Sequence, residues 1–182
     1  MTKIAVHLAE GFEEIEAITI VDVLRRAGFE VTTVSVTSDI KVTGSHSIPV
    51  IADELFENID YNFIDMIVLP GGMPGSKNLN NHEELKSQIL QFNEKGKPLG
   101  AICAAPLVLG QLGILRGKNA TCYPGFESYL EGAKLTGSAT ELAGNIVTGK
   151  GAGVAIDFAL KIVEMLKGKE QANDLAKRMI VQ

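Results

Sequence analysis

Short apolar runs alternate with amphipathic stretches along the chain. The runs at residues 65–69 and 99–102 are almost continuously hydrophobic, as strands of a parallel sheet are when both faces are covered. Between such runs, apolar residues recur three or four positions apart, which predicts helices. Strands or short β segments are expected at residues 3–8, 30–36, 40–42, 48–52, 65–69, 99–102 and 117–122, with a hairpin at 141–148. Helices are expected at residues 13–27, 83–94, 104–113, 126–131 and 154–166, and again after Gly168.

This alternation of strands and helices predicts an α/β fold with a mostly parallel sheet. We expect a flavodoxin-like sandwich of three layers, with helices on both faces of the sheet. The first helix carries Ile15, Ile18, Val21 and Leu24 on its apolar face. Residues 70–82 are rich in Pro, Gly and Asn, and they are expected to form a turn.

Length and composition favour a single domain that spans residues 1–182. Hydrophobic residues make up 46% of the 182 positions, which is enough for one substantial core. The net charge is −5 and no basic stripe is present, so nucleic acid is not an expected partner. The longest apolar runs are too short to span a membrane, and no signal peptide is visible. Two cysteines make no disulfide framework, and the cytoplasm is therefore the expected compartment.

Cys103 lies at the bend between the strand at 99–102 and the helix that follows it. A bend of this kind exposes a side chain at the carboxyl end of a sheet and points free N–H groups toward it. A helix N-terminus favours the thiolate, which predicts a cysteine pKa lowered to roughly 3.5–7.5. The alternative is that Cys103 is a small buried hydrophobe, as free cysteines often are.

Three loops should meet at this edge of the sheet, where ligands bind in folds of this type. They are residues 10–16, residues 70–74 and the turn at Cys103. Gly71 and Gly72 let the backbone approach a ligand closely. The N–H groups of Gly72 and Ala104 form a candidate oxyanion hole for charge that develops on a carbonyl oxygen. The alternative for the glycine pair is an ordinary tight turn.

Glu16 lies in the first predicted helix and has two readings. A carboxyl group within reach of Cys103 would act as a general acid and base or hydrogen-bond to the sulfur, and burial would raise its pKa into a useful range. Spacing alone favours the alternative, a solvated glutamate on the helix surface.

Several separated segments, in the correct order, carry a family resemblance. They are Ala9-Glu10-Gly11-Phe12-Glu13-Glu14-Ile15-Glu16, Val21-Asp22-Val23-Leu24-Arg25-Arg26-Ala27-Gly28, Val68-Leu69-Pro70-Gly71-Gly72, Ala101-Ile102-Cys103-Ala104 and Phe158-Ala159-Leu160-Lys161-Ile162-Val163-Glu164. The chain closely resembles the ThiJ/PfpI superfamily, and within it the parkinsonism-associated deglycase branch, the DJ-one proteins, as a bacterial-type member. The resemblance covers essentially the whole chain.

The resemblance implies a flavodoxin-like homodimer in which Cys103 is the reactive nucleophile, held in a strained backbone conformation. It implies that Glu16 is the protonated partner of the sulfur, and that Gly72 and Ala104 supply the oxyanion N–H groups beside Gly71. Proteins of this branch are credited with glutathione-independent conversion of methylglyoxal or glyoxal to the hydroxy acid and with deglycation of early glycation adducts. They are also described as redox-responsive chaperones of the oxidative-stress response.

Two positions depart from the family pattern. Tyr123 stands where the animal proteins carry a histidine, so a cysteine–histidine couple from that site is impossible. His46 aligns with an arginine that the partner subunit is expected to contribute to the rim, which replaces a fixed charge with one that titrates near neutral pH. Arg26 matches a second basic residue near the site, and we expect it to attract anions there.

Neighbouring chemistries are less favoured. Related peptidases place a histidine directly after the cysteine, where this chain has Ala104, and related amidotransferases need a late His-x-Glu pair that is missing. The three histidines lack ligand spacing, so neither a metal nor another cofactor is expected. Residues 149–153 fit no phosphate-loop pattern and are interpreted as the start of a helix. Cys122 is interpreted as structural, with a peripheral redox role as the alternative.

Two functions follow from these residues. The first is a glyoxalase-type lyase or deglycase-like hydrolase, in which Cys103 attacks a small aldehyde or glycated substrate and Glu16 transfers the proton. The second is a non-catalytic redox sensor or chaperone, in which Cys103 oxidises to a sulfinic acid.

Overall fold

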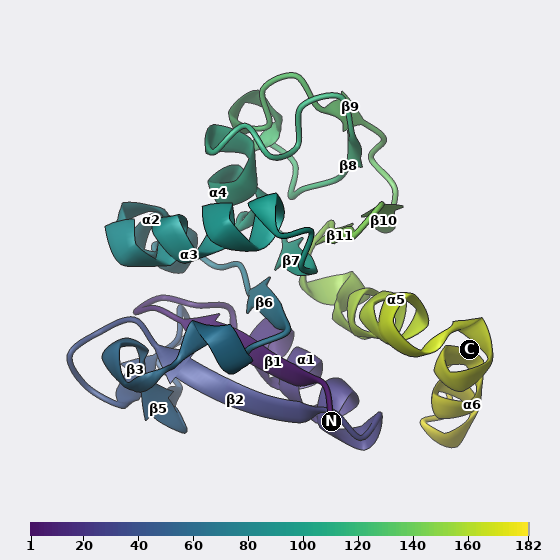
Figure 1. The fold of residues 1–182 in the computed structure, drawn as a ribbon, viewed down its shortest axis with the longest axis horizontal. Helices are drawn as coiled ribbons and strands as arrows, with labels where there is room; N and C mark the ends of the chain where they lie inside the picture. The colour runs from purple at the N-terminus through teal and green to yellow at the C-terminus, as the bar shows by residue number, and fades with distance from the viewer. Residues whose placement is uncertain (182) are drawn as a thin grey trace.

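The structure is a computed structural model that describes residues 1–181 (Figure 1). Its strands are β1 Lys3–Leu8, β2 Glu30–Ser35, β3 Lys41–Thr43, β4 Pro49–Ile51, β5 Glu54–Leu55, β6 Met66–Leu69, β7 Leu99–Ile102, β8 Asn119–Ala120, β9 Lys134–Leu135, β10 Thr140–Ala143 and β11 Ile146–Gly149. Its α-helices are α1 Glu14–Arg26, α2 Gly75–Asn81, α3 Glu83–Glu94, α4 Pro106–Gln111, α5 Ala155–Lys167 and α6 Lys169–Arg178. Short 3-10 helices are η1 Phe56–Asn58, η2 Tyr61–Phe63, η3 Glu127–Tyr129 and η4 Ala152–Val154.

A seven-stranded sheet in the order β10-β11-β7-β6-β1-β2-β5 forms the middle layer. Neighbouring strands are parallel except for β10 and β11, which form the antiparallel hairpin expected from the sequence. The flavodoxin-like, mostly parallel α/β sandwich is therefore confirmed. The strand order reverses direction at β1, which lies between β2 and β6. The carboxyl ends of β1, β6 and β7 consequently flank the crevice in which such sheets bind ligands.

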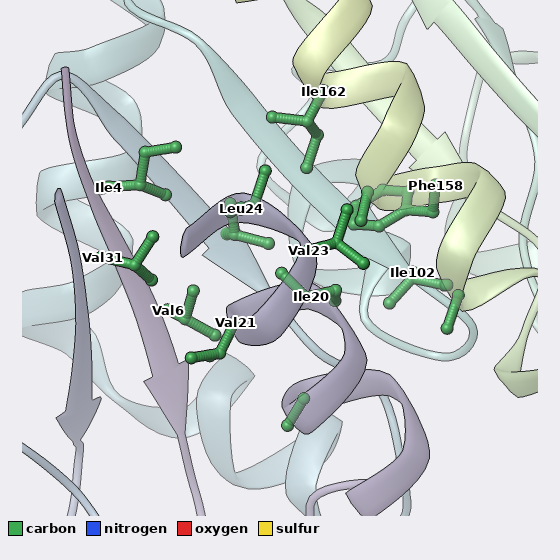
Figure 2. Close-up of a cluster of buried hydrophobic side chains, with 14 of the residues drawn as sticks. Ile4, Val6, Ile20, Val21, Val23, Leu24, Val31, Ile102, Phe158 and Ile162 are labelled. Atoms are coloured by element: carbon green, nitrogen blue, oxygen red, sulfur yellow. The ribbon is translucent and has the colours of Figure 1, made fainter. Parts of the chain in front are cut away.

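Helices cover both faces of the sheet because side chains alternate along each strand. Ile4, Val6 and Leu8 of β1 belong to the buried core that contains α1, α5 and α6. Ala5, between them, belongs to the second core, which contains α2, α3 and α4. Figure 2 shows the first core, where side chains of α1 lie between β1 and the side chains Phe158 and Ile162 of α5.

The expected face of α1 is only half correct. Val21 and Leu24 are buried as expected, but Ile15 and Ile18 are 58% and 48% exposed, and Glu16, Ala17 and Ile20 are buried instead. Apolar residues that recur every three positions drift around a helix of about 3.6 residues per turn, so Ile15 and Leu24 lie on opposite sides of α1 and cannot share one face. The helix itself begins and ends within one residue of its expected bounds.

Two further differences lie around the loops. Residues 75–81 form α2, where a turn was expected; seven residues rich in Gly and Asn gave no helical pattern, and packing on α4 holds the helix in place. The helix expected at 104–113 is only Pro106–Gln111, because residues 103–105 form the turn itself. Among residues 1–181, the structure contains no helix with the length and apolar character that crossing a membrane requires.

Candidate functional site

Cys103 follows directly after β7, and its backbone φ is +64°, a left-handed conformation that non-glycine residues rarely adopt. Two hydrogen bonds hold it there. Its N–H donates to the Gly149 carbonyl at 2.9 Å, and its own carbonyl accepts from the Tyr123 N–H at 2.7 Å. The end of β11 and the loop at Tyr123 therefore fix the bend from two sides. The half-buried side chain borders a pocket.

Glu16 projects from α1 toward the same bend, and its side chain is 0% exposed. The Gly71 N–H donates to Oε2 at 2.7 Å, and Oε1 has no hydrogen-bond partner among the described residues. Burial raises the pKa of Glu16 to about 7, although the interaction with Cys103 and the bond from Gly71 act in the opposite direction. The solvated surface position that spacing favoured for Glu16 is therefore wrong.

Gly71 lies where Glu16 and Cys103 come together. A Cβ at this position would come within 2.5 Å of the Cys103 Cβ, 2.7 Å of the Glu16 Oε2 and 2.8 Å of the Ile102 carbonyl. Only glycine leaves room for both side chains at this point. The neighbouring Gly72 has a φ of +93°, so glycine is also required there by conformation.

The electrostatics of Cys103 depend on Glu16. Burial and the negative charge of an ionised Glu16 raise the pKa of the Cys103 thiol to about 12, and the N–H groups of Gly72 and Ala104 act to lower it. The lowered Cys103 pKa that was expected from a helix N-terminus is therefore wrong. Burial has the largest effect on this pKa, and the helix begins only at Pro106 and is six residues long. Two anions this close are costly, so the pair holds at most one negative charge near neutral pH. When the proton lies on Glu16, the repulsion that opposes the thiolate is gone.

The pocket beside Cys103 has a volume of about 400 Å³. Its lining residues are Glu13, Glu16, His46, Gly72, Met73, Cys103, Ala104, Tyr123, Phe126 and Ala152. Residues from α1, from the turns after β6 and β7, and from two loops far apart in the sequence thus meet at one edge of the sheet. The structure brings together Cys103, Glu16, Gly72, Ala104, Tyr123 and His46 from the residues singled out in the sequence.

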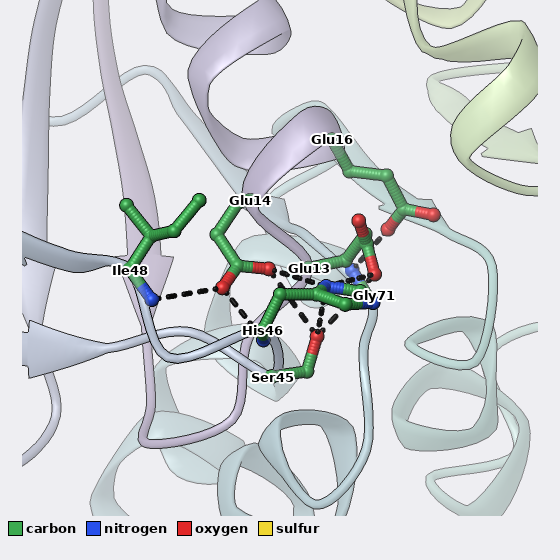
Figure 3. Close-up of polar contacts among 7 residues, drawn as sticks. All are labelled: Glu13, Glu14, Glu16, Ser45, His46, Ile48 and Gly71. Carbon is green, nitrogen blue, oxygen red and sulfur yellow. Dashed lines mark hydrogen bonds and ion pairs between the residues drawn. The ribbon is translucent and has the colours of Figure 1, made fainter.

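A polar cluster at one side of the pocket was missed in the sequence (Figure 3). Glu14 accepts hydrogen bonds from the His46 N–H at 2.7 Å and the Ile48 N–H at 3.4 Å, and its Oε2 lies 2.9 Å from His46 Nδ1. Ser45 Oγ lies 3.4 Å from Glu13 Oε2 and 3.3 Å from Glu14 Oε2, and its single proton is shared between these two acceptors. No local pattern announces these contacts, because they join α1 to a loop about thirty residues later.

The charges in this cluster favour an ion pair. Burial alone would raise the pKa of Glu14, but hydrogen bonds from His46 and from the backbone lower it to about 2. The same bond and the charges of Glu13 and Glu14 raise the pKa of His46. The possible ligand atoms of Glu13, Glu14 and His46 lie within 4.8 Å of one another, which is close enough for all three to bind one metal ion. The Glu14 oxygens are already taken by N–H and hydroxyl donors, so the contacts seen are those of a structural ion pair.

The two expected basic rim residues lie in different places. His46 lines the pocket of its own chain. Arg26 lies at the far end of α1, ten residues from Glu16 or roughly 15 Å along the helix axis, and pairs with Asp22 at 2.6 Å. The expected contribution of Arg26 to this rim is therefore wrong within the chain. Helical spacing over ten residues fixes that separation.

Comparison with known proteins gives consistent matches. The model of the DJ-1/PfpI family matches residues 2–165. The chain is 38% identical over 182 residues to protein DJ-1 homolog B of Arabidopsis thaliana, covering 99% of this chain and 42% of that protein. It is 38% identical to protein dj-1beta of Drosophila melanogaster, covering 100% of this chain and 98% of that one. The chain thus spans less than half the length of the Arabidopsis relative.

Two other matches bear on chemistry and fold. The glutathione-independent glyoxalase DJR-1.2 of Caenorhabditis elegans is 36% identical over 175 residues, covering 92% of this chain and 90% of that protein. The solved structure of oxidized Toxoplasma gondii DJ-1 superposes with a TM-score of 0.94 at 37% identity, covering 99% and 98% of the two chains.

Proposed function

Because the chain belongs to the DJ-1/PfpI family, we propose that it is a cysteine-dependent enzyme that converts small 2-oxoaldehydes to 2-hydroxy acids without glutathione. The observation that carries the proposal is the pairing of Cys103 with a buried carboxyl group whose pKa is raised to about 7, beside two backbone N–H donors. A group with that pKa both accepts and donates protons at neutral pH. The relative that bears the name glutathione-independent glyoxalase supports the same chemistry.

The reaction begins at the aldehyde carbon. Glu16 takes the thiol proton as the Cys103 sulfur bonds to that carbon, and the N–H groups of Gly72 and Ala104 stabilise the charge that develops on the oxygen. Glu16 then gives its proton to this oxygen, which produces a hemithioacetal and restores the carboxylate. The negative charge thus passes from the carboxylate to the substrate without two anions occupying the site together.

The second stage moves a proton between two carbons. The Glu16 carboxylate takes the proton from the former aldehyde carbon, which gives an enediolate, and the protonated carboxyl group returns it to the neighbouring carbon. The hydroxyl proton of the hemithioacetal passes to the neighbouring oxygen in the same stage. The former aldehyde carbon is now a thioester and the former ketone carbon an alcohol. One is oxidised and the other reduced, so no external oxidant is needed. Water then hydrolyses the thioester, which releases the 2-hydroxy acid and restores the thiol.

A redox-sensing role is a second candidate, favoured by Glu16 Oε1, which has no hydrogen-bond partner among residues 1–181. A protonated Oε1 would donate to a sulfinate oxygen on Cys103, and the Gly72 and Ala104 N–H groups would bind the negative charge. Mild peroxide treatment followed by mass spectrometry tests this role. Addition of two oxygens to Cys103 ahead of Cys122 and the methionines supports it, and equal oxidation of all of them contradicts it.

The chain is also proposed to form a homodimer through the outward side of α1. Ile15 and Ile18 are exposed there, and Ile48 and Ile51 of the β4 region are exposed as well. Exposed aliphatic side chains on a structured surface are typical of a protein interface. Analytical ultracentrifugation gives the mass directly.

The test of the enzymatic proposal is lactate formation from methylglyoxal by the purified protein without glutathione. The wild type should form lactate, and Cys103→Ser, in which a hydroxyl replaces the sulfur, should not. Gly153→Ala is the matched control, because a Cβ there meets no atom within 4 Å. Lactate formation by Cys103→Ser would contradict the proposal.

A further inference from the structure

Three aromatic side chains form a row that starts at the Cys103 pocket. Tyr123 and Phe126 have ring centroids 6.4 Å apart in an edge-to-face arrangement, and Phe126 and Tyr129 have centroids 5.9 Å apart. Two turns set this spacing, since the Phe126 N–H donates to the Tyr123 carbonyl and the Tyr129 N–H to the Phe126 carbonyl, both at 3.1 Å. We call these three residues the aromatic row.

The two tyrosines of the aromatic row are exposed to solvent. Tyr123 and Tyr129 are 49% and 42% exposed. The chain has no tryptophan and only 5% aromatic residues, and most of its core is aliphatic. Aromatic side chains exposed beside a reactive group supply a large, rigid contact surface for a ligand.

The row connects the pocket to a neighbouring cavity. Tyr123 and Phe126 line the Cys103 pocket, while Phe126 and Tyr129 line a second cavity of about 330 Å³. Met73 is also shared by the two. A ligand whose reactive end lies at Cys103 therefore has Tyr123 and Phe126 within the same pocket.

The volume and the charges of the Cys103 pocket further restrict the class of ligand that it can bind. A pocket of about 400 Å³ has the size that holds a drug-sized ligand, far more than the five heavy atoms of methylglyoxal need. Glu13 and Glu16 line the Cys103 pocket, and none of its lining residues is lysine or arginine, whereas Lys77 lines the second cavity. The positive charge available on its lining is that of His46, which is paired with Glu14 at 2.9 Å. The pocket therefore fits an uncharged substituent better than an anionic one.

We propose that the aromatic row binds an aryl substituent of the substrate, so that the preferred substrates are uncharged aryl 2-oxoaldehydes such as phenylglyoxal. The proposal rests on the proposed function and names its substrate class. The chemistry is unchanged: the aldehyde carbon bonds to Cys103, one water is consumed, and phenylglyoxal gives mandelate. The ring packs against Tyr123 and Phe126 and adds binding that a methyl group cannot make.

The first arm of the test measures binding without turnover. Iodoacetamide labels the Cys103 thiol, and mass spectrometry of the Cys103 peptide gives the labelling rate. Acetophenone, an aryl ketone without an aldehyde, should slow this labelling, while acetone and benzoate should need at least about tenfold higher concentrations. Tyr123→Ala and Phe126→Ala should each weaken the protection by acetophenone about fivefold. Phe63→Ala is the control, because Phe63 is exposed and lines neither cavity.

The second arm measures turnover. The kcat/KM for phenylglyoxal should exceed that for methylglyoxal by about tenfold, and Tyr123→Ala or Phe126→Ala should lower this ratio about fivefold. The ratio between variants cancels the different intrinsic reactivity of the two aldehydes. Two substitutions are used because Phe126 also packs on the core and the exposed Tyr123 does not.

The outcomes separate this inference from the proposed function. Protection by acetophenone that depends on the row, without turnover of either aldehyde, supports the aryl site and contradicts the enzymatic proposal. Turnover of methylglyoxal without protection by acetophenone overturns the aryl site and leaves the enzymatic proposal standing. The aryl site is also overturned if benzoate and acetophenone protect equally well, or if protection by acetophenone is unchanged in both Tyr123→Ala and Phe126→Ala.

Discussion

Replacement of Glu16 by glutamine should make the protein more stable at pH 8. The carboxyl group is fully buried, and its pKa is raised from 4.5 to about 7. Above pH 7 the folded protein must therefore hold an ionised carboxylate that water would solvate better in the unfolded chain. Glutamine has nearly the same shape, and its carbonyl oxygen can still accept the hydrogen bond that the Gly71 N–H donates.

The size of the effect follows from the difference between the two pKa values. Each pH unit between 4.5 and about 7 corresponds to about 1.36 kcal/mol, so the cost of ionising Glu16 reaches about 3 kcal/mol at pH 8. A raised carboxyl pKa favours the folded state below it, and this advantage is lost as the pH rises through about 7. At pH 5 the stability gained by Glu16→Gln should be about 1 kcal/mol or less, roughly 2 kcal/mol below the gain at pH 8, since most folded molecules then carry a neutral Glu16.

Urea unfolding at pH 5 and pH 8, at one protein concentration, measures these free energies. Glu14→Gln is the matched control on the same helix, because the pKa of Glu14 is lowered to about 2 by hydrogen bonds from His46 and the backbone against the effect of burial. Its carboxylate stabilises the folded state above the unfolded pKa, so Glu14→Gln should destabilise at pH 8. A Glu16→Gln protein less stable than the wild type at pH 8, or a difference independent of pH, would refute the reasoning.

Three other substitutions test the packing and the surfaces. Gly71→Ala should lower kcat about 100-fold, because the added Cβ would lie closer than 3 Å to Cys103 and Glu16 and would displace Glu16. Gly153→Ala should leave kcat unchanged, because its Cβ meets no atom within 4 Å, and equal kcat values in the two variants would contradict the role of Gly71. Tyr61→Phe should cost about 1–3 kcal/mol in urea unfolding, because it removes the buried 2.6 Å hydrogen bond to His7, and an unchanged midpoint would show that the bond is not needed. Ile18→Glu should convert the proposed dimer to monomers in analytical ultracentrifugation, and a dimer of undiminished stability would place the interface elsewhere.

Much of the fold could be predicted because the signals are local. The helix Glu83–Glu94 has the expected bounds, and a histidine side chain caps its first turn. The strands Met66–Leu69 and Leu99–Ile102 were identified by almost continuous apolar runs. The burial of Glu16 on one side of α1 could not be predicted in the same way. Which side of an amphipathic helix is buried depends on the neighbouring helix, and α5 lies more than a hundred residues later.

The site, too, could be predicted from the sequence only in part. The bend at Cys103 and the glycines after β6 could be located in the sequence, and the family resemblance assigned Glu16 to them. The pKa values could not be predicted, because burial of both side chains and their mutual repulsion depend on contacts between separate elements. The polar cluster of Glu13, Glu14, Ser45 and His46 arises from a loop folding onto α1, which no local pattern encodes.

The central claim is that Glu16 carries a proton for Cys103, and the turnover of Glu16→Gln tests it most directly. Glutamine fills the same space but cannot exchange a proton, so kcat for methylglyoxal should fall at least about 100-fold. In the wild type, kcat/KM should rise with pH through about 7, as Glu16 becomes the base that accepts the proton. A Glu16→Gln enzyme that keeps its kcat within about tenfold of the wild type would contradict the account.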